Sequence, residues 1–211
     1  MLAVQDLSFA YRKGAEELFG GLEYAFRPGA MTAITGPSGR GKSTLLYVLG
    51  LMLTPTAGQV LLGGEPVSAL PDWQRSRLRA TRIGFVFQDA ALDPSRTILD
   101  SVREPALYAG GTPAQIEGRA RELMDQMGVA ARADHRPGEI SGGQAQRVAV
   151  CRALITDPAV VLADEPTGNL DRANAEEVLG ALSEATGGSR TVVIATHDPF
   201  VIEHADEVLA L

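Results

Sequence analysis

The hydrophobic and polar positions of this chain predict three successive blocks of secondary structure. The first block alternates apolar and polar residues, which is typical of β-strands with one buried face. A glycine-rich loop at residues 36–44 interrupts this block, and the apolar segment after it predicts a buried helix over Ser43–Met52. The strands predicted here cover Val4–Tyr11, Leu22–Phe26, Met31–Thr35, Gln59–Leu62 and Ile83–Phe87, with a turn at Gly63 and Gly64.

The second block is helical, and the third returns to alternating strands and helices. Helical spacing predicts Ile98–Tyr108, Pro113–Met127 and Ser141–Ile155 in the second block. The order of the blocks predicts an α/β fold with a parallel-sheet core, a small antiparallel layer and a helical subdomain. The elements predicted in the third block are strands over Val160–Ala163, Thr191–Ala195 and Val208–Leu211 and helices over Ala173–Ala185 and Phe200–Ala205.

Composition and charge limit the classes of protein that the chain can represent. Its 211 residues suit one domain, and 45% hydrophobic with 21% charged residues excludes a disordered chain. A net charge of −7 argues against a dedicated nucleic-acid binder, which would present a basic face. Asp6 interrupts any signal sequence, and the apolar run Leu45–Leu53 is about half of the ~20 residues that a membrane helix needs. We therefore expect an intracellular protein that does not itself cross a membrane.

The glycine-rich loop matches the phosphate-binding pattern G-x-x-x-x-G-K-[ST]. Its glycines let successive backbone N–H groups curl around an anion, and the helix that follows points its positive end at the phosphates. Lys42 supplies a cation for the β- and γ-phosphates, and Ser43 offers a hydroxyl to Mg²⁺, which prefers oxygen ligands. The residues predicted to bind the nucleotide are Gly36, Pro37, Ser38, Gly39, Arg40, Gly41, Lys42, Ser43 and Thr44.

Two acidic residues follow the apolar strand Val160–Ala163. Asp164, delivered at the carboxyl end of a buried strand, suits a direct or indirect contact with Mg²⁺ in a phosphate-transfer site. Glu165 is placed to polarise a water molecule for in-line attack on the γ-phosphate. The alternative is a solvated acidic pair at the end of a strand, which is common when no phosphate loop is present.

The segment Ser141–Gln144 predicts a capped helix start with an unusual composition. Ser141 and Gln144 have the spacing of a capping box. Gly142 and Gly143 weaken the first helical turn, so capping alone does not call for them. What they provide is a set of exposed N–H groups at a positive helix end, open to an anion. The sequence leaves open whose phosphate this helix meets.

Together these motifs resemble those of the ATP-binding subunits of ABC transporters, over roughly residues 2–211. The resemblance implies a RecA-like P-loop NTPase core with an N-terminal antiparallel β subdomain and a helical insert. Tyr11 matches the aromatic residue that stacks on adenine in this family. Six motifs fall in the family's order: the P-loop Gly36–Thr44, the glutamine loop Phe85–Gln88, the signature Ser141–Gln144, the acidic strand Val160–Pro166, the loop Asn169–Asp171 and the switch residue His197.

The resemblance also implies roles for single residues. Gln88 would join Ser43 and Asp164 at Mg²⁺ and couple that site to a membrane partner. His197 would contact the γ-phosphate and orient the attacking water, acting in catalysis with Glu165 and Lys42. Asp171 would contact the facing subunit. The signature residues Ser141, Gly142, Gly143 and Gln144 would bind the γ-phosphate of ATP held by a second subunit.

At the level of the whole protein, the resemblance implies an ATPase with ATP and Mg²⁺ as cofactors. Two copies of the chain, or this chain and a paralogous ATPase, would close on two ATP molecules. The further partner would be an integral membrane permease and not a nucleic acid. This places the protein in the cytoplasm, peripheral on the inner face of the cell membrane. The single ABC ATPase domain, 1–211, would divide into a nucleotide-binding core, about 1–87 and 156–211, and a helical subdomain with the signature, about 88–155.

The segment Asp164–Asp171 resembles the branch of macrolide exporters, lipoprotein-release ATPases and the cell-division ATPase of that group. This implies a subunit that drives export or extraction through a separate permease. The alternative is a non-transport ATPase that regulates a membrane or cell-wall-remodelling complex. Arg40 stands where the family usually has a small residue, and either an added phosphate contact or an acidic partner across the dimer would explain it.

A few conspicuous residues are predicted to be structural. Cys151, the single cysteine, excludes an intrachain disulfide and fits a packed helix position. His135 and His204 match no motif and are expected to be structural or on the surface. Trp73 lies in a polar stretch and is expected to be a packing residue.

Overall fold

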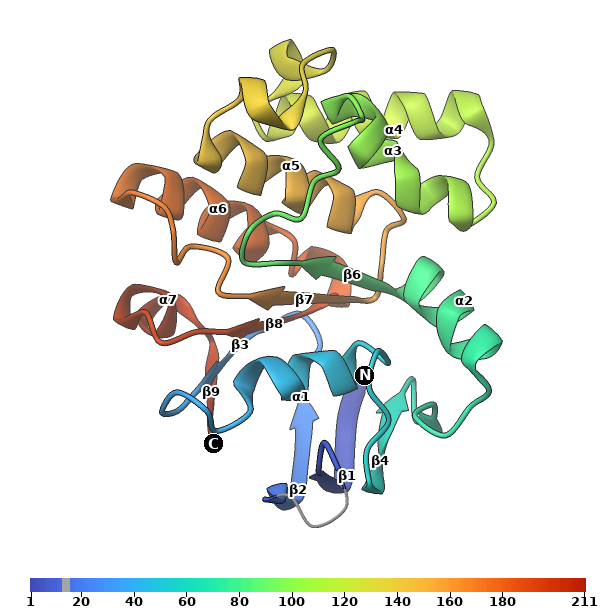
Figure 1. Ribbon diagram of the computed structural model, residues 1–211, viewed down its shortest axis with the longest axis vertical. Helices are drawn as coiled ribbons and strands as arrows, with labels where there is room; N and C mark the ends of the chain where they lie inside the picture. The colour runs from blue at the N-terminus through green and yellow to red at the C-terminus, as the bar shows by residue number, and fades with distance from the viewer. Residues whose placement is uncertain (13–15) are drawn as a thin grey trace.

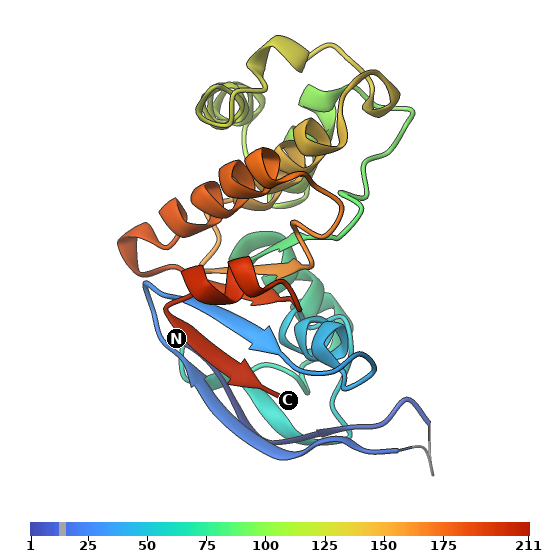
Figure 2. The same ribbon diagram turned by 90° about the vertical axis from the view of Figure 1, so that its left-hand side faces the viewer.

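A parallel sheet forms the centre of the molecule, and a second, antiparallel sheet lies beyond helix α1 (Figure 1). The computed structural model describes residues 1–12 and 16–211. The strand order of the parallel sheet is β6-β7-β8-β3-β9, and that of the antiparallel sheet is β2-β1-β4-β5. Seen from the side, the helical region, the parallel sheet and the antiparallel sheet lie one below another (Figure 2). The predicted α/β fold is therefore confirmed.

The elements lie close to their predicted ranges. The strands are β1 Leu2–Phe9, β2 Leu18–Phe26, β3 Met31–Thr35, β4 Ala57–Leu62, β5 Glu65–Pro66, β6 Ile83–Val86, β7 Val160–Asp164, β8 Thr191–Ala195 and β9 Glu207–Ala210. The helices are α1 Lys42–Leu49, α2 Asp72–Arg82, α3 Ile98–Tyr108, α4 Pro113–Gln126, α5 Gly142–Leu154, α6 Arg172–Glu184 and α7 Pro199–His204, with short 3₁₀ turns at Ala130–Arg132, Pro137–Glu139 and Gly187–Ser189.

The inner strands of the parallel sheet, β7, β8 and β3, are buried on both faces, which explains their continuous apolar sequences, whereas the edge strand β9 is partly exposed. Successive side chains of a strand point to opposite faces, so neighbouring residues enter different cores. On β7, Val160 and Leu162 pack with α1 and the antiparallel sheet. Val161 and Ala163 pack instead with the helices on the other face. One sheet thus joins two hydrophobic cores.

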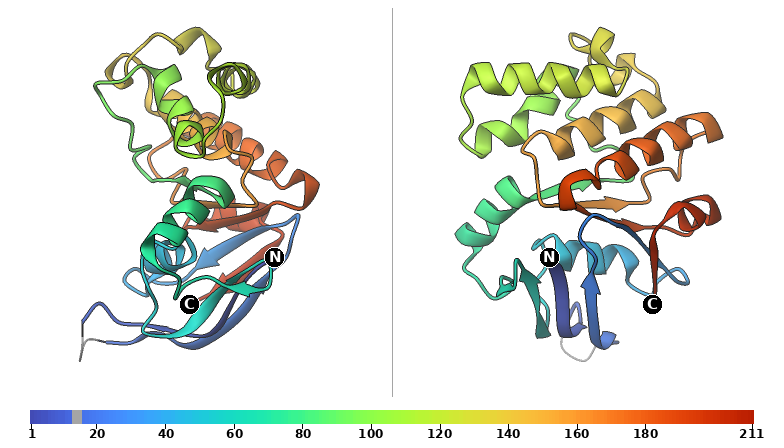
Figure 3. Two further views of the ribbon diagram at one scale, coloured as in Figure 1. Left: turned by 90° about the vertical axis from the view of Figure 1, so that its right-hand side faces the viewer. Right: turned by 180° about the vertical axis from the view of Figure 1, so that it is seen from behind.

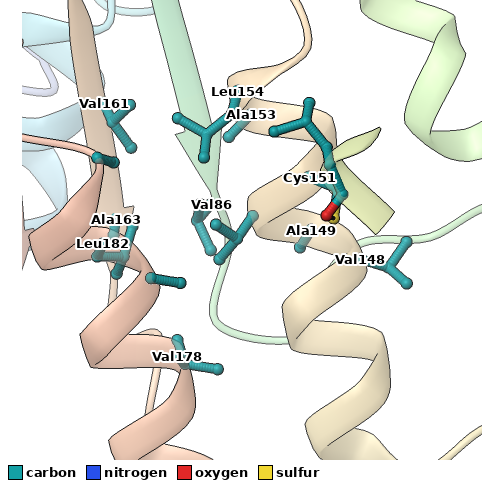
Figure 4. Close-up of a cluster of buried hydrophobic side chains, with 14 of the residues drawn as sticks. Val86, Val148, Ala149, Cys151, Ala153, Leu154, Val161, Ala163, Val178 and Leu182 are labelled. Carbon is teal, nitrogen blue, oxygen red and sulfur yellow. Dashed lines mark hydrogen bonds between the residues drawn. The ribbon is translucent and has the colours of Figure 1, made fainter. Parts of the chain in front are cut away.

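Helix α5 attaches the helical region to the sheet. Figure 4 shows Val86 of β6 between α5 and side chains of α6 and β7, with Val148 on the side of α5 that faces away from Val86. Cys151 is buried, and burial raises the pKa of its thiol to about 12, so it is a packed helix residue as predicted. The helical region therefore shares its core with one face of the sheet rather than having a separate one.

Helix α2 is an element that the sequence analysis did not assign, and the expectation for Trp73 beside it was wrong. The segment Asp72–Arg82 is strongly polar, and none of its residues is buried. Trp73, expected to pack, is 66% exposed, since it lies in the first turn of this surface helix.

The other differences from the predicted elements are local. Helix α1 ends at Leu49 rather than Met52, and Tyr11 follows the end of β1. Views from the other two sides show α2 at the edge of the molecule (Figure 3).

Over 1–12 and 16–211, no helix has both the length and the apolar character that crossing a bilayer requires.

Replacing Gly84 by Ala tests the close packing of β6 against α5. A Cβ at this position would lie 2.2 Å from the carbonyl oxygen of Ala153, and backbone atoms on both sides leave little room to adjust. We expect the variant to lose about 1–3 kcal/mol of unfolding free energy, measured by urea denaturation. Gly118→Ala is the matched control, because Gly118 lies on α4 with open space around it. The control should gain about 0.5–1 kcal/mol, and equal losses in both variants would contradict this packing.

Candidate functional site

The sheet topology brings the predicted catalytic residues to one edge. The loop with Lys42 follows β3, Glu165 follows β7, and His197 follows β8. These three strands are neighbours in the order β7-β8-β3 and run parallel, so their carboxyl ends lie side by side. Ligands of open α/β sheets bind at this edge. The candidate site therefore lies where β3, β7 and β8 end.

The phosphate loop adopts a backbone that requires glycine. Gly36 has a φ of 141°, and a Cβ there would lie 2.8 Å from the carbonyl oxygen of Leu211. Gly41 caps α1 in the left-handed region, with a φ of 94°. Lys42 Nζ donates to the carbonyl oxygens of Gly36, at 2.8 Å, and Pro37, at 3.4 Å. The ammonium group thus lies within the loop, where a phosphate would compete with these carbonyls for it.

Ser43 and Asp164 form the oxygen-rich part of the site. Ser43 Oγ donates to Asp164 Oδ1 at 2.9 Å, and the Tyr47 hydroxyl donates to Asp164 Oδ2 at 3.3 Å. Asp164 is 6% exposed, and burial raises the pKa of its carboxyl while the bonds from Ser43 and Tyr47 oppose that rise. A hydroxyl and a desolvated carboxylate in contact are ligands of the type that Mg²⁺ prefers. The donor set therefore fits a hard divalent cation beside the phosphate loop.

Glu165 is held in a fixed orientation by the end of β8. Its backbone has a φ of 44°, in the left-handed region, and its N–H donates to the carbonyl oxygen of Ala195 at 2.9 Å. Thr196 Oγ1 donates to Glu165 Oε2 at 3.1 Å, and His197 Nδ1 lies 2.6 Å from Glu165 Oε1. The Glu165 side chain is 14% exposed, whereas that of His197 is 76% exposed. Strained backbone of this kind concentrates at active sites. These contacts therefore hold the Glu165 carboxylate in one orientation.

The glutamine loop and the signature turn form no side-chain hydrogen bond with this cluster among the described residues. Gln88 is exposed in the turn after β6, and among the described residues no hydrogen bond joins it to Ser43 or Asp164. Ser141 caps α5 with the predicted capping box: its Oγ accepts from the backbone N–H of Gln144 at 3.2 Å. Gln88, Gly142 and Asn169 line one cavity of about 220 Å³. The glutamine loop, the signature turn and the loop before Asp171 therefore meet at one cavity, which Pro166, the residue after Glu165, also lines.

Tyr11 and Arg40 lie at the margin of the phosphate loop. The Tyr11 hydroxyl lies 2.7 Å from Thr44 Oγ1, and its ring packs edge-on against Phe9 with centroids 4.9 Å apart. The residue is 68% exposed, so one face of the ring is open beside the loop. Arg40 is exposed at the tip of the loop.

Sequence reasoning missed two residues of the cluster. Tyr47 lies four positions after Ser43, which places both on one face of α1, and this spacing was a usable signal. Thr196 precedes the switch histidine, but its hydrogen bond to Glu165 depends on the pairing of β7 with β8. Only the fold supplies that contact.

Comparison with known proteins gives consistent matches. The family model described as "ABC transporter" matches residues 19–168. The lipoprotein-releasing system ATP-binding protein LolD of Paramagnetospirillum magneticum is 42% identical, over 100% of this chain and 94% of that protein. The macrolide export ATP-binding/permease protein MacB of Marinobacter nauticus is 41% identical over 97% of this chain and 32% of its own length. The ATP-binding cassette MJ0796, solved as a dimer bound to ADP and phosphate, has a TM-score of 0.91 and 32% identity, covering 100% of this chain and 94% of that one.

Replacing Asp164 by Asn tests whether burial of this carboxylate lowers stability in the nucleotide-free protein. Because burial raises the folded-state pKa, the folded protein binds more protons than the unfolded chain as the pH rises from acid. Its stability therefore falls as the pH rises through the folded-state pKa. Asn still accepts from Ser43 without burying a charge, so we expect D164N to be more stable than wild type near neutral pH.

Urea unfolding of D164N and wild type at about pH 7 and below about pH 4 measures this difference in stability. Below about pH 4 the Asp164 carboxyl is mostly protonated even in the unfolded chain. The stability gap should shrink at the acid pH. A gap of equal size at both pH values would show that the charge of Asp164 is not its cause.

Proposed function

The chain belongs to the ABC transporter family as an ATPase cassette, and from this premise we propose how its residues hydrolyse ATP and what the reaction drives. The single observation that carries the mechanism is the position of Glu165. Its carboxylate is held by Thr196 and His197, one residue from the aspartate that bonds to Ser43 of the phosphate loop. A base and a phosphate-binding loop therefore lie at the same edge of the sheet.

In the proposed reaction, Glu165 accepts a proton from water while the water oxygen attacks the γ-phosphorus in line. The bond from the γ-phosphorus to the oxygen that bridges it to the β-phosphate breaks, which yields ADP and phosphate. His197 orients the carboxylate through Nδ1, and its exposed ring is free to meet the γ-phosphate. General-base catalysis of this kind typically contributes 10²–10⁴-fold.

We propose that the nucleotide is held by the phosphate loop and by Tyr11. Lys42 would exchange its bonds to Gly36 and Pro37 for bonds to the β- and γ-phosphates, since its ammonium group already lies inside the loop. Tyr11 would stack on adenine with the open face of its ring. The remaining contacts would come from backbone N–H groups at the start of α1.

Mg²⁺ is proposed at the Ser43–Asp164 pair, with Gln88 as a further ligand. When bound, the ion would neutralise part of the phosphate charge. Burial disfavours the negative charge of Asp164, and a bound cation would stabilise that charge. Ser43 supplies a neutral oxygen beside it. Gln88 lies at the start of the segment that leads to α3, so a change at the nucleotide would reach the helical region through it.

A second subunit is proposed to complete each ATP site. The signature turn, Ser141–Gln144, and Asp171 lie apart from the chain's own phosphate loop, which fits a role toward a facing subunit. The dimeric state of the similar cassette MJ0796 supports this arrangement. The facing subunit would be a second copy of this chain or a paralogous ATPase. The two subunits would favour the closed state only by the extra contacts that ATP makes there.

The dimer is proposed to power a separate integral membrane permease from the cytoplasmic face of the membrane. The similar proteins are named for lipoprotein release and macrolide export, which supports export or extraction over a regulatory role. MacB combines ATP-binding and permease parts in its name, and this chain matches 32% of it.

Glu165→Gln tests the proposed base. The amide keeps the size of the side chain but cannot take a proton from water, so we expect ATP binding to persist and turnover to fall at least about 100-fold. Lys42→Ala is the contrasting control, because loss of the ammonium group should weaken ATP binding itself. Nucleotide-binding titrations and phosphate-release assays separate the two effects. Turnover at the wild-type rate in E165Q would eliminate Glu165 as the base.

Ser141→Arg tests the role of the signature turn toward a second subunit. A large cation at the exposed start of α5 should block approach of the facing subunit, so we expect unchanged ATP binding by the monomer and no dimer. Light scattering after size-exclusion chromatography with Mg-ATP, in the Glu165→Gln background, measures this. Ser183→Arg, at an exposed position near the end of α6, is the control and should dimerise. A dimer of S141R equal to the control would remove the signature turn from the interface.

A further inference from the structure

Asn174, in the first turn of α6, donates hydrogen bonds to the carboxylate of Asp171 from both its side chain and its backbone. Its side-chain Nδ2 donates to Asp171 Oδ1 and Oδ2, each at 2.9 Å. Its backbone N–H donates separately to Asp171 Oδ1, also at 2.9 Å, as an ordinary helix cap. These hydrogen bonds lower the pKa of the Asp171 carboxyl. Asp171 is thus kept ionised and fixed in direction.

The other end of the same amide lies against the signature turn. A Cβ on Gly143 would lie 2.1 Å from Asn174 Oδ1 and 2.4 Å from its Cγ. A Cβ on the neighbouring Gly142 would meet no atom within 4 Å. The contact with Asn174, which lies in the same chain, therefore leaves no room for a side chain at Gly143.

Helices α5 and α6 are packed in a way that maintains this contact. Figure 1 and Figure 3 both show the two helices lying side by side. Arg147, one turn beyond Gly143 on α5, forms an ion pair with Glu177, one turn beyond Asn174 on α6. The amide of Asn174 is therefore confined between two anchored helix starts. A Cβ added at Gly143 would require that amide to shift, and we expect such a shift to weaken its two bonds to Asp171.

We propose that Asn174 is a positioning residue that locks Asp171 to the signature turn, so that both segments meet the second subunit as one rigid unit. This rests on the proposed function, in which the signature turn and Asp171 face that subunit. A residue that only starts α6 would need the backbone bond alone. The side chain adds a link between α5 and the loop before α6 that the helix does not require.

The first experiment uses the Glu165→Gln protein with Mg-ATP and measures dimer dissociation by analytical ultracentrifugation. Asn174→Ala keeps the backbone cap and removes only the amide, so ATP affinity of the monomer should stay unchanged while the dimer weakens about tenfold, the size expected for lost hydrogen bonds to a charged group. Asn174→Asp, of equal size, cannot donate to a carboxylate and should weaken it at least as much. Glu184→Ala, at the exposed end of α6, is the matched control and should dimerise like its parent.

A double-mutant cycle tests the contact with Gly143. If the effect of Gly143→Ala passes through Asn174, the pair Gly143→Ala and Asn174→Ala should weaken the dimer by less than the product of the single effects. Independent effects that multiply fully, or an N174A dimer as tight as the Glu184→Ala control, would overturn the proposal.

A second readout needs no dimer and separates this inference from the proposed function. NMR titration of the Asp171 carboxyl in the monomer should show its pKa rising toward the ordinary value in both Asn174→Ala and Gly143→Ala. An unchanged pKa in Gly143→Ala would overturn the link between the signature turn and Asp171. Failure of the Glu165→Gln parent to dimerise, with the pKa rising in both variants, would instead count against the two-subunit site and leave the link standing.

Discussion

Parallel pairing of β3, β8 and β7 is the constraint on which the site depends. Only parallel neighbours end at the same edge, and the phosphate loop, Glu165 and His197 each begin within two residues of the end of one of these strands. Burial on both faces then holds the strands in register, because Val160 and Leu162 anchor one core while Val161 and Ala163 anchor the other. The distances of the site are thus set by packing far from it.

Two residues at this edge of the sheet, Gly36 and Glu165, have backbone conformations with positive φ. Gly36 approaches Leu211 too closely for a side chain, and Glu165 takes a left-handed φ that most residues avoid. Local preference alone would not produce either geometry. Both sit at a strand end whose hydrogen bonds continue into the neighbouring strand, as from Glu165 to Ala195, and these bonds offset the strain.

The sequence predicted most of this fold because its strands and helices bury continuous or periodic apolar faces. Helix α2 escaped prediction for the converse reason, since it buries no residue and Trp73 stands in solvent. Motifs whose parts are adjacent in the chain, such as the phosphate loop and the Ser141 capping box, were predictable from local chemistry. Contacts across the chain were not: the bond from Thr196 to Glu165 and the proximity of Asn174 to Gly143 exist only through the pairing of strands and helices.

Burial of Cys151 gives the molecule a built-in reporter. Its thiol donates to the carbonyl oxygen of Leu123 within the core shared by α5 and the sheet, and a pKa of about 12 leaves almost no thiolate near neutral pH. An alkylating reagent can therefore reach the single thiol of this chain only when α5 separates from its neighbours. The labelling rate would measure how often α5, the helix that begins at the signature turn, opens. Comparing this rate with and without nucleotide would show whether nucleotide changes the opening of α5.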